Sequence, residues 1–573
     1  MSFSSSINHL FRKSPLARTF LWVFIVLAAI ILSAVIGRNV KRKPSICSIN
    51  PTVGSPGDIM VINGENFGTS RGTSYVELGG SHVTSSGYIE WTDNQIKIVL
   101  PSNVQDGLVI VGTSAGRSEP SFFANESSIP VAVHTDVQTT IPVLESVSPE
   151  LSAVGQVVTI LGSNFGSVRG TSQVYFTAGR EVASNTTSNS PFSEPSESVA
   201  KKIEYLPASE NDYDYEFWSD TELHVRVPDG ATDGQVYVQT AKGTSESKKI
   251  TLDTSAGKKQ YSDKHTYIIQ VSADVANAVS DSNATITLYV PRPSVTSFQP
   301  TVDLTECFPE PLIKDDKRVI VHQKQLKQFA NRKQRFTQNY VVTNYAITSA
   351  VKSQRVTSYL DSERLLYSDC LKTNSLLPVS NSTIIGLKDK IIEKATNPYV
   401  QAKLIYDFMI ENYKIENTVR TGNVSILDLP VQKKGDAYDF AILYTTLCRA
   451  SGIPAVPVSG ILIQEDSSSI NHWWTELYFE NFGWFPVDVS LGAGLDYKPF
   501  TLISDPKTYY FGNLDSQHIA FSRGWKNIKP SIVGSKTVYR PRTYALQSIW
   551  EEATTGTKSY SSLWNDPVIL GIY

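Results

Sequence analysis

Apolar and polar residues follow three different patterns along this chain. An uncharged apolar run covers residues 19–37. From residue 44 to about 365, short runs of alternating apolar and polar residues are separated by Gly, Asn and Asp, which is typical of antiparallel strands. From Ser380 onward, apolar residues recur at helical spacing, as in Ile385, Ile391 and Ile392. The pattern predicts a membrane helix, a long β region and then a mixed α+β region.

The run at 19–37 is expected to be a single transmembrane helix behind a tail at 1–18. As a helix it would be about 28 Å long, close to the roughly 30 Å apolar core of a bilayer. A cleaved signal peptide is the alternative, but the run is longer than a usual signal core and no small-x-small cleavage site precedes Arg38. Basic residues stand on both sides of the run, so the charge pattern alone does not set its orientation.

Two segments of the β region repeat one another. NPTVGSPGDIMVINGENFGTSRG, from residue 50, parallels SPELSAVGQVVTILGSNFGSVRG, from residue 148, with Gly64 opposite Gly162. Later in each copy, Trp91 stands opposite Trp218. Each copy is predicted to form a small β-sandwich, over 44–123 and 141–252. The second copy carries an insertion at 184–212, whose Ser, Asn, Pro and Glu content predicts a flexible loop.

The repeated motif, with the Trp-Ser/Thr-Asp turn that follows, resembles IPT/TIG domains, which have an immunoglobulin-like fold. The resemblance implies a spacing or adhesive role without chemistry. Its glycines are expected to supply positive φ angles or bulges between strands.

A β-rich lead-in region is expected at 265–391, followed by an α+β domain at 392–525 and a C-terminal extension at 526–573. Asp436 can cap a helix whose apolar stripe includes Phe440 and Leu447 and which ends at Gly452. The segment INHWWTELYFENFGWFPVDVSLG follows with strand and hairpin signals.

The α+β domain resembles the transglutaminase-like, papain-type superfamily. The pattern of that family is Gly-x-Cys at a helix start, RxxGIP at its end, His-x-Trp on a strand and GWxxxD on the next. FGNLDSQHIAFSRG, from Phe511, also resembles the end of bacterial members. The resemblance assigns the base to His472, the orienting carboxylate to Asp488 and the nucleophile to position 437. That position carries Ala437, and a methyl group cannot act as a nucleophile.

No other cysteine is spaced along the chain so that its thiol could take the place of one at position 437. Cys448 lies about 16 Å along the same predicted helix from Ala437 and is expected to be a packing residue. Trp473, Trp474 and Trp484 are interpreted as core residues, with the lining of a ligand site as the alternative.

Composition narrows the possible functions. With 52 basic and 55 acidic residues and a net charge of −3, the chain has no electrostatic signature of nucleic-acid binding. The four cysteines show no zinc-ligand spacing and no HExxH motif occurs, so no metal and no cofactor is expected.

The leading hypothesis is a binding or scaffold protein, anchored in a membrane and extracytoplasmic, in the periplasm or at the cell surface. This location follows from the resemblance to bacterial envelope proteins. The degenerate domain would bind peptides or cell-envelope polymers, because binding groups and reacting groups are different atoms. The alternatives are an active peptidase or acyltransferase with a non-standard nucleophile, and a purely structural role.

Overall fold

The computed structural model describes residues 42–573 except 103, 126–139, 181–202, 282, 315–317, 331, 360–363, 421–424, 525–533, 541 and 547–548. Before residue 42 it describes only Thr19, Val23, Val26 and Leu27. The predicted tail at 1–18 and nearly all of the predicted helix at 19–37 therefore lie outside the described residues and stay predictions. Within the described part of the chain, no helix is long and apolar enough to cross a membrane.

The first repeat forms a unit of two facing sheets, because its alternating strands bury one side each. Its core contains Met60, Ile62, Ile96 and Ile98, all fully buried. One sheet has the order β1 (Ser45–Asn50), β3 (Ile59–Glu65), β7 (Gln95–Val99) and β6 (Tyr88–Trp91). The other has the order β2 (Val53–Gly54), β10 (Ser121–Asn125), β8 (Gly107–Thr113), β4 (Tyr75–Leu78) and β5 (Ser81–His82), with β9 (Gly116–Arg117) beside β8.

The second repeat has the same strand order, as the duplication predicts. One sheet runs β11 (Val143–Ser148), β13 (Val157–Ser163), β17 (Glu222–Arg226) and β16 (Tyr215–Trp218). The other runs β12 (Leu151–Ser152), β20 (Lys248–Leu252), β18 (Ala231–Thr240), β14 (Gln173–Ala178) and β15 (Tyr205–Pro207), with β19 (Gly243–Thr244) beside β18.

The end of the insertion expected to be a flexible loop is folded. Residues 181–202 lie outside the described residues, but β15 pairs with β14 and Leu206 is buried. Asp212 accepts hydrogen bonds from Trp484 and Arg523 of the α+β domain. The loop prediction is wrong for 205–207, which form β15, because the strand that pairs with them lies outside the insertion and local composition cannot reveal it.

The repeated glycine is required by close packing rather than by a positive φ. A Cβ atom on Gly64 would lie 2.0 Å from the carbonyl oxygen of Ser45 and against the ring of Phe67. On Gly162 it would lie 2.0 Å from the carbonyl oxygen of Val143 and against Phe165. The glycine therefore has the same role in both copies: it allows close packing at a point of the strand that has no room for a side chain.

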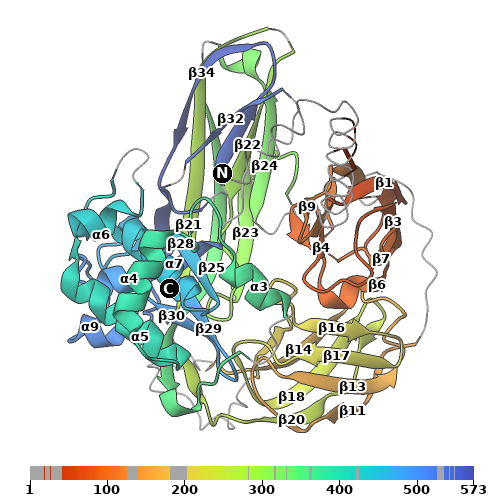
Figure 1. Ribbon diagram of the computed structural model, residues 1–573. Coiled ribbons are helices and arrows are strands. Elements are labelled where there is room, and N and C mark those ends of the chain that lie inside the picture. The colour runs from red at the N-terminus through yellow and green to blue at the C-terminus, as the bar shows by residue number, and fades with distance from the viewer. Residues whose placement is uncertain are drawn as a thin grey trace, which may run out of the picture. The chain divides into compact units, whose positions relative to one another are not determined.

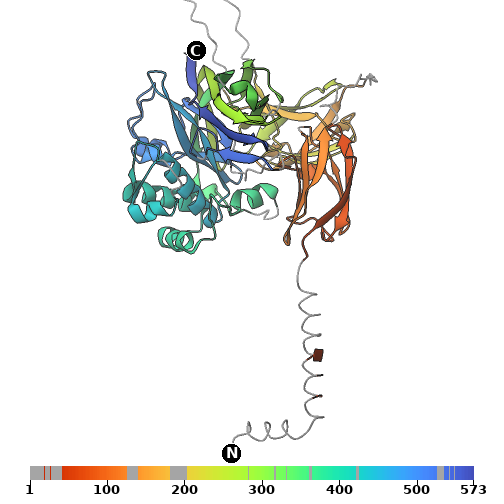
Figure 2. The ribbon, with the colours of Figure 1, turned by 90° about the horizontal axis from the view of Figure 1, so that it is seen from above.

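The lead-in region consists of two sheets that the C-terminal strands complete. One contains β23 (Thr301–Phe308), β25 (Gln334–Val351), β21 (Gly257–Ser280), β34 (Thr557–Trp564) and β35 (Val568–Ile572). The other runs β24 (Val319–Gln325), β22 (Thr285–Pro291), β33 (Trp550–Ala553) and β32 (Lys536–Tyr539). In both ribbon views the dark blue C-terminal strands lie among the green lead-in strands (Figure 1 and Figure 2). The four strands within 536–572, a segment expected as an extension, are thus part of the lead-in fold.

The α+β domain is a four-stranded antiparallel sheet with α7 packed on it (Figure 1). The sheet order is β30 (Gly483–Val487), β29 (Ser469–Phe479), β28 (Ala455–Ile463) and β31 (His518–Arg523). The helices are α3 (Leu365–Leu371), α4 (Ser382–Ile392), α5 (Pro398–Asn412), α6 (Asp428–Gln432), α7 (Ala437–Ala450), α8 (Val489–Gly492) and α9 (Pro506–Tyr509). Short elements are β26 (Lys414–Ile415), β27 (Lys434–Gly435) and the 3-10 turns η1 (Ser85–Gly87), η3 (Leu326–Phe329) and η4 (Ser353–Arg355).

Candidate functional site

The position assigned to the nucleophile is the first residue of α7. Asp436 caps the helix: its side chain accepts a hydrogen bond from the backbone N–H of Asp439, and the side chain of Asp439 accepts one from the backbone N–H of Asp436. Ala437 follows directly and has 4% of its surface exposed. A side chain there lies at the positive end of the helix dipole, where a thiol would be acidified, but a methyl group gains nothing from this field.

The structure brings His472 and Asp488 together, as the sequence predicts. His472 lies on β29, and Asp488 follows β30 and caps α8. Nε2 of the histidine and Oδ2 of the aspartate are 2.5 Å apart, and both side chains are fully buried. This pairing leaves Nδ1 of His472 buried and without a hydrogen-bond partner among the residues that the structure describes. The base and the carboxylate of the expected dyad are therefore in place.

His518 is a third member of the site that the sequence analysis did not single out. Its Nε2 lies 3.2 Å from Oδ2 of Asp488 and its Nδ1 lies 2.8 Å from Oδ1 of Asp515. The segment FGNLDSQHIAFSRG, which supported the family resemblance, contains both residues. The sequence signal that could have identified His518 is its spacing of three residues from Asp515, because a carboxylate so near in sequence can reach the imidazole.

The hydrogen bonds of Asp488 indicate which neighbouring groups donate to its carboxylate. Its Oδ1 accepts hydrogen bonds from the hydroxyl of Ser490 and the backbone N–H of Leu491, while its Oδ2 faces both imidazoles. Burial by itself raises the pKa of Asp488, but the charges and hydrogen bonds of the two histidines lower it overall. An ionised carboxylate only accepts hydrogen bonds, so Nε2 of His472 and Nε2 of His518 each donate to it.

His518 is the positive charge that balances the two carboxylates. Burial lowers its pKa, but the charge of Asp515 and hydrogen bonds to Asp488 and Asp515 raise the pKa of His518 to about 9. Burial also opposes ionisation of Asp515, and the charge of His518 outweighs this and lowers the pKa of that carboxyl. At neutral pH the network is therefore a charged imidazole between two carboxylates, with His472 at its end.

Ala437 is buried in a cluster that includes a residue from the C-terminal part of the chain. Ala437 belongs to a buried cluster that includes Leu377, Trp473 and Leu546. The backbone N–H of Leu546 donates to the hydroxyl of Ser459 at 2.7 Å. A residue from the segment between β32 and β33 thus belongs to the same buried cluster as Ala437.

Arg542, from the same segment as Leu546, binds the carboxylates at the start of α7. Nη1 of Arg542 lies 2.8 Å from Oδ2 of Asp436, and its Nη2 lies 2.8 Å from Oδ1 of Asp439. The guanidinium carbon also lies 4.2 Å from the centre of the Tyr438 ring. Arg542 therefore pairs with both capping carboxylates and stacks on the residue after Ala437, while Arg420 also pairs with Asp439 at 3.3 Å.

The three tryptophans considered for a ligand site are core residues. Trp473 and Trp474 are fully buried and Trp484 is 6% exposed. Trp484 packs between Tyr478 and the guanidinium of Arg523, whose carbon lies 3.9 Å from its ring centre. Their burial excludes a direct ligand-lining role in this conformation.

The cysteines of this domain are unsuited to replace the missing thiol. Cys448 is fully buried on the far part of α7, and burial raises the pKa of its thiol well above the usual range. Burial also raises the pKa of Cys370 to about 12. A thiol of such high pKa is almost entirely protonated at pH 7 and is a poor nucleophile.

Three of the site residues could in principle hold a metal ion. In the part of the chain that the structure describes, His472, Asp488 and His518 place one ligand atom each within 4.8 Å of the others. Two imidazole nitrogens and one carboxylate oxygen are ligands that zinc accepts. Here Nε2 of each histidine already bonds to Oδ2 of Asp488, so a metal ion would have to displace both hydrogen bonds.

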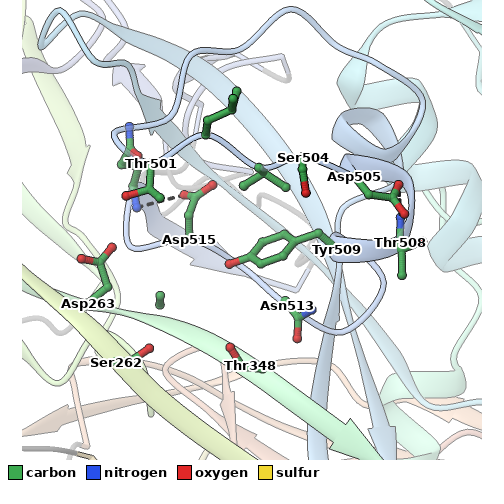
Figure 3. Close-up of a pocket in the computed structure, with 14 residues that line it drawn as sticks. Ser262, Asp263, Thr348, Thr501, Ser504, Asp505, Thr508, Tyr509, Asn513 and Asp515 are labelled. Carbon is green, nitrogen blue, oxygen red and sulfur yellow. Dashed lines mark hydrogen bonds between the residues drawn. The ribbon is translucent and has the colours of Figure 1, made fainter.

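A polar cavity adjoins the other end of this network. It has a volume of about 690 Å³ and Asp515, the partner of His518, forms part of its lining. Figure 3 shows Asp515 and Tyr509 near its centre, with Asp263 on one side. Asp515 therefore contacts the buried histidine on one side and lines an open cavity on the other.

Comparison with known protein families identifies two domain types. Residues 44–124 match the IPT/TIG domain and residues 385–489 match the transglutaminase-like superfamily. The chain therefore contains an IPT/TIG domain and a transglutaminase-like domain, as the sequence motifs predict. The same strand order in the second repeat extends the first of these folds to 143–252.

The chain spans only part of each relative that it matches. It is 41% identical over 83 residues to cyclomaltodextrin glucanotransferase of Paenibacillus macerans, covering 14% of this chain and 11% of that protein. It is 27% identical over 163 residues to an uncharacterized protein of Haemophilus influenzae, covering 23% of this chain and 44% of that protein.

Solved structures with a similar fold include a putative cysteine protease from Cytophaga hutchinsonii, at 15% identity and a TM-score of 0.35 over 55% of this chain and 93% of that one. The periplasmic domain of TgpA from Pseudomonas aeruginosa is similar at 12% identity and a TM-score of 0.22, over 40% of this chain and 86% of that one.

Proposed function

We propose that this chain is a non-catalytic binding or scaffold protein, built on a transglutaminase-like domain without a working nucleophile. The observation that carries the proposal is the environment of Ala437. This residue begins α7, where the resemblance assigns the thiol. It carries only a methyl group, is 4% exposed and shares a buried cluster with Leu546. A base and an orienting carboxylate without a nucleophile can neither form nor resolve an acyl intermediate.

The proposal extends to where the protein acts. The apolar run at 19–37 anchors the chain in a membrane, the IPT/TIG domains act as a stalk, and the bulk of the chain lies outside the cytoplasm. The ligands are peptides or cell-envelope polymers. Because the residues around Ala437 are buried, we place the binding of such ligands on other surfaces of the domain.

The competing function is an active peptidase or acyltransferase with another nucleophile. The buried thiols of Cys370 and Cys448 argue against it, since burial raises the pKa of each. Loss of a triad nucleophile costs on the order of a million-fold in rate in a measured serine protease.

The test compares the purified wild-type protein with a His472→Ala variant on peptide-amide and peptide-ester substrates, with and without an added amine. We expect the same background rate from both proteins. Hydrolysis or transfer by the wild-type protein that disappears in His472→Ala would refute a non-catalytic role. An Ile385→Ala variant, altered on an exposed side chain of α4, serves as the preparation control.

A further inference from the structure

The polar cavity beside Asp515 has the composition of a ligand site. It lies between the paired strands β21 and β25 of the lead-in region and the segment that joins α8 to β31. Ala346, Asp515 and Gln517 are its buried residues, and the other lining residues are partly or fully exposed. The full lining is Ser262, Asp263, Ala346, Thr348, Thr501, Leu502, Ile503, Ser504, Asp505, Thr508, Tyr509, Asn513, Asp515 and Gln517.

Local backbone features turn polar groups toward this space. The pairing of β21 with β25 shifts register between Ser262 and His265, and Asp263 has a φ of 48° within this bulge. A bulge redirects a side chain that would otherwise follow the alternation of the strand. On the opposite side, Asp505 caps the short helix α9 and so holds the segment that carries Thr501 and Ser504.

Several hydroxyl groups in the lining are available to a ligand. The side chains of Ser262, Thr348, Thr501 and Ser504 have no hydrogen-bond partner among the residues that the structure describes. Tyr509 adds an aromatic ring, and Figure 3 shows it lying across the cavity between Asp515 and Thr508. Hydroxyls both donate and accept hydrogen bonds, which suits a partner that also carries hydroxyls.

The charges of the lining select against anionic ligands. The lining contains three carboxylates and no Lys, Arg or His, so an anion would be repelled. Two of the carboxylates are already engaged, Asp515 with His518 and Asp505 with the backbone N–H of Thr508. The third, Asp263, accepts a hydrogen bond from the hydroxyl of Ser516 at 2.7 Å. The remaining oxygen lone pairs can accept hydrogen bonds from O–H donors of a ligand.

We propose that this cavity binds a short neutral oligosaccharide, with Tyr509 packed against a sugar face and the lining hydroxyls bonded to sugar hydroxyls. A volume of about 690 Å³ lies within the range of small-molecule sites and admits more than a single sugar ring. The proposal rests on the binding role proposed above and names the class of polymer. Asp515 would form the contact between this ligand and the buried network of His518.

The experiment measures binding of cellotriose, chitotriose and maltotriose to the purified full-length protein by isothermal titration calorimetry and ligand-observed NMR. We expect at least one of these neutral probes to bind, with little change between low and high salt. Tyr509→Ala is expected to weaken that binding about tenfold, because it removes the stacking surface.

A second variant tests the same site in case Tyr509→Ala does not fold. Thr501→Ala combined with Ser504→Ala removes two hydroxyls without internal partners, so stability is retained while affinity falls severalfold. The matched control is Thr418→Ala, which removes a hydroxyl from a different cavity, around residues 414–420, and leaves saccharide binding unchanged.

Two results would overturn the saccharide proposal. One is the absence of binding by all three probes to a folded wild-type protein. The other is salt-sensitive binding of spermidine in their place, which would make the site a cation site. Neither result bears on the absence of catalysis, which the His472→Ala comparison tests separately.

Discussion

Nδ1 of His518 lies 2.8 Å from Oδ1 of Asp515, and this contact links the open cavity to the buried pair formed by Asp488 and His472. The imidazole is therefore held between two carboxylates in a fully buried site. The charge of this group decides how the domain responds to pH.

The stability of the domain is expected to fall between pH 6.5 and pH 9. The pKa of His518 is raised from 6.5 to about 9 in the folded protein, so the stabilisation is complete below pH 6.5 and is lost as the pH rises through 9. The full effect is about 3 kcal/mol in the free energy of unfolding. Urea unfolding across this range measures it.

His518→Gln provides the control for this pH dependence. An amide can still bond to Asp515 and Asp488 but does not titrate, so the fall between pH 6.5 and 9 should be absent. The lowered pKa values of Asp488 and Asp515 affect stability at acidic pH, where their contribution is lost as the pH falls below 3.8. An unchanged slope in the glutamine variant would contradict the assigned charge of His518.

Arg542→Ala is expected to destabilise the protein by about 3 kcal/mol, measured by urea unfolding at pH 7. The change leaves the buried carboxylates of Asp436 and Asp439 without the cation that bonds both. Burial and the charge of Asp436 already raise the pKa of Asp439, so protonation relieves the repulsion. The defect should therefore shrink as the pH falls toward 4.

A matched control for this change is Arg117→Ala, which breaks the partly exposed ion pair with Glu77 in the first repeat. Such exposed pairs contribute well under about 1 kcal/mol. Equal losses in the two variants would argue that Arg542 is an ordinary surface cation.

An introduced thiol measures whether the space beside Ala437 is closed. In Ala437→Cys the new thiol should react slowly with iodoacetamide, because residue 437 is 4% exposed and lies in a buried cluster with Leu546. Adding Leu546→Ala should speed the reaction about tenfold or more, since it removes part of the cover.

Peptide mapping by mass spectrometry follows this reaction at each cysteine separately. Cys47 is exposed and serves as the internal reference in every variant. Rapid labelling at position 437 in the single variant would mean that the segment around Leu546 does not cover the site.

Gly162→Ala is expected to destabilise the second repeat by about 3 kcal/mol, because the new Cβ would lie 2.0 Å from the carbonyl oxygen of Val143. Gly386→Ala, within α4, is the control: a Cβ added there would have no neighbouring atom within 4 Å, and alanine favours helices. Thermal unfolding of both variants should show a loss for the first and no loss for the second.

The sequence pattern alone predicts the repeated β-sandwiches of this fold. The duplication predicts two β-sandwiches of one topology. The family resemblance implies that His472 and Asp488 form a pair, and they are in contact because His472 lies on β29 and Asp488 directly follows the neighbouring strand β30. His518 was missed because one histidine at the start of a strand carries no periodic signal. Its role appears only when β31 pairs with β28 and brings it to Asp488.

The C-terminal strands could not be placed from sequence for a related reason. Ile286 of β22 pairs with Ala553 of β33, and no local feature of either segment specifies a partner so far away in the chain. The cover over Ala437 depends on the same pairing, because Arg542 and Leu546 stand between β32 and β33.

The pairing of β22 with β33 also sets an order of events during protein synthesis. The ribosome makes β22 more than two hundred residues before β33, so one edge of this strand has no partner while the whole α+β domain is being translated. An unpaired strand edge is a template for aggregation. The lead-in sheets therefore close last, and newly made chains need protection of that edge until translation has passed residue 553.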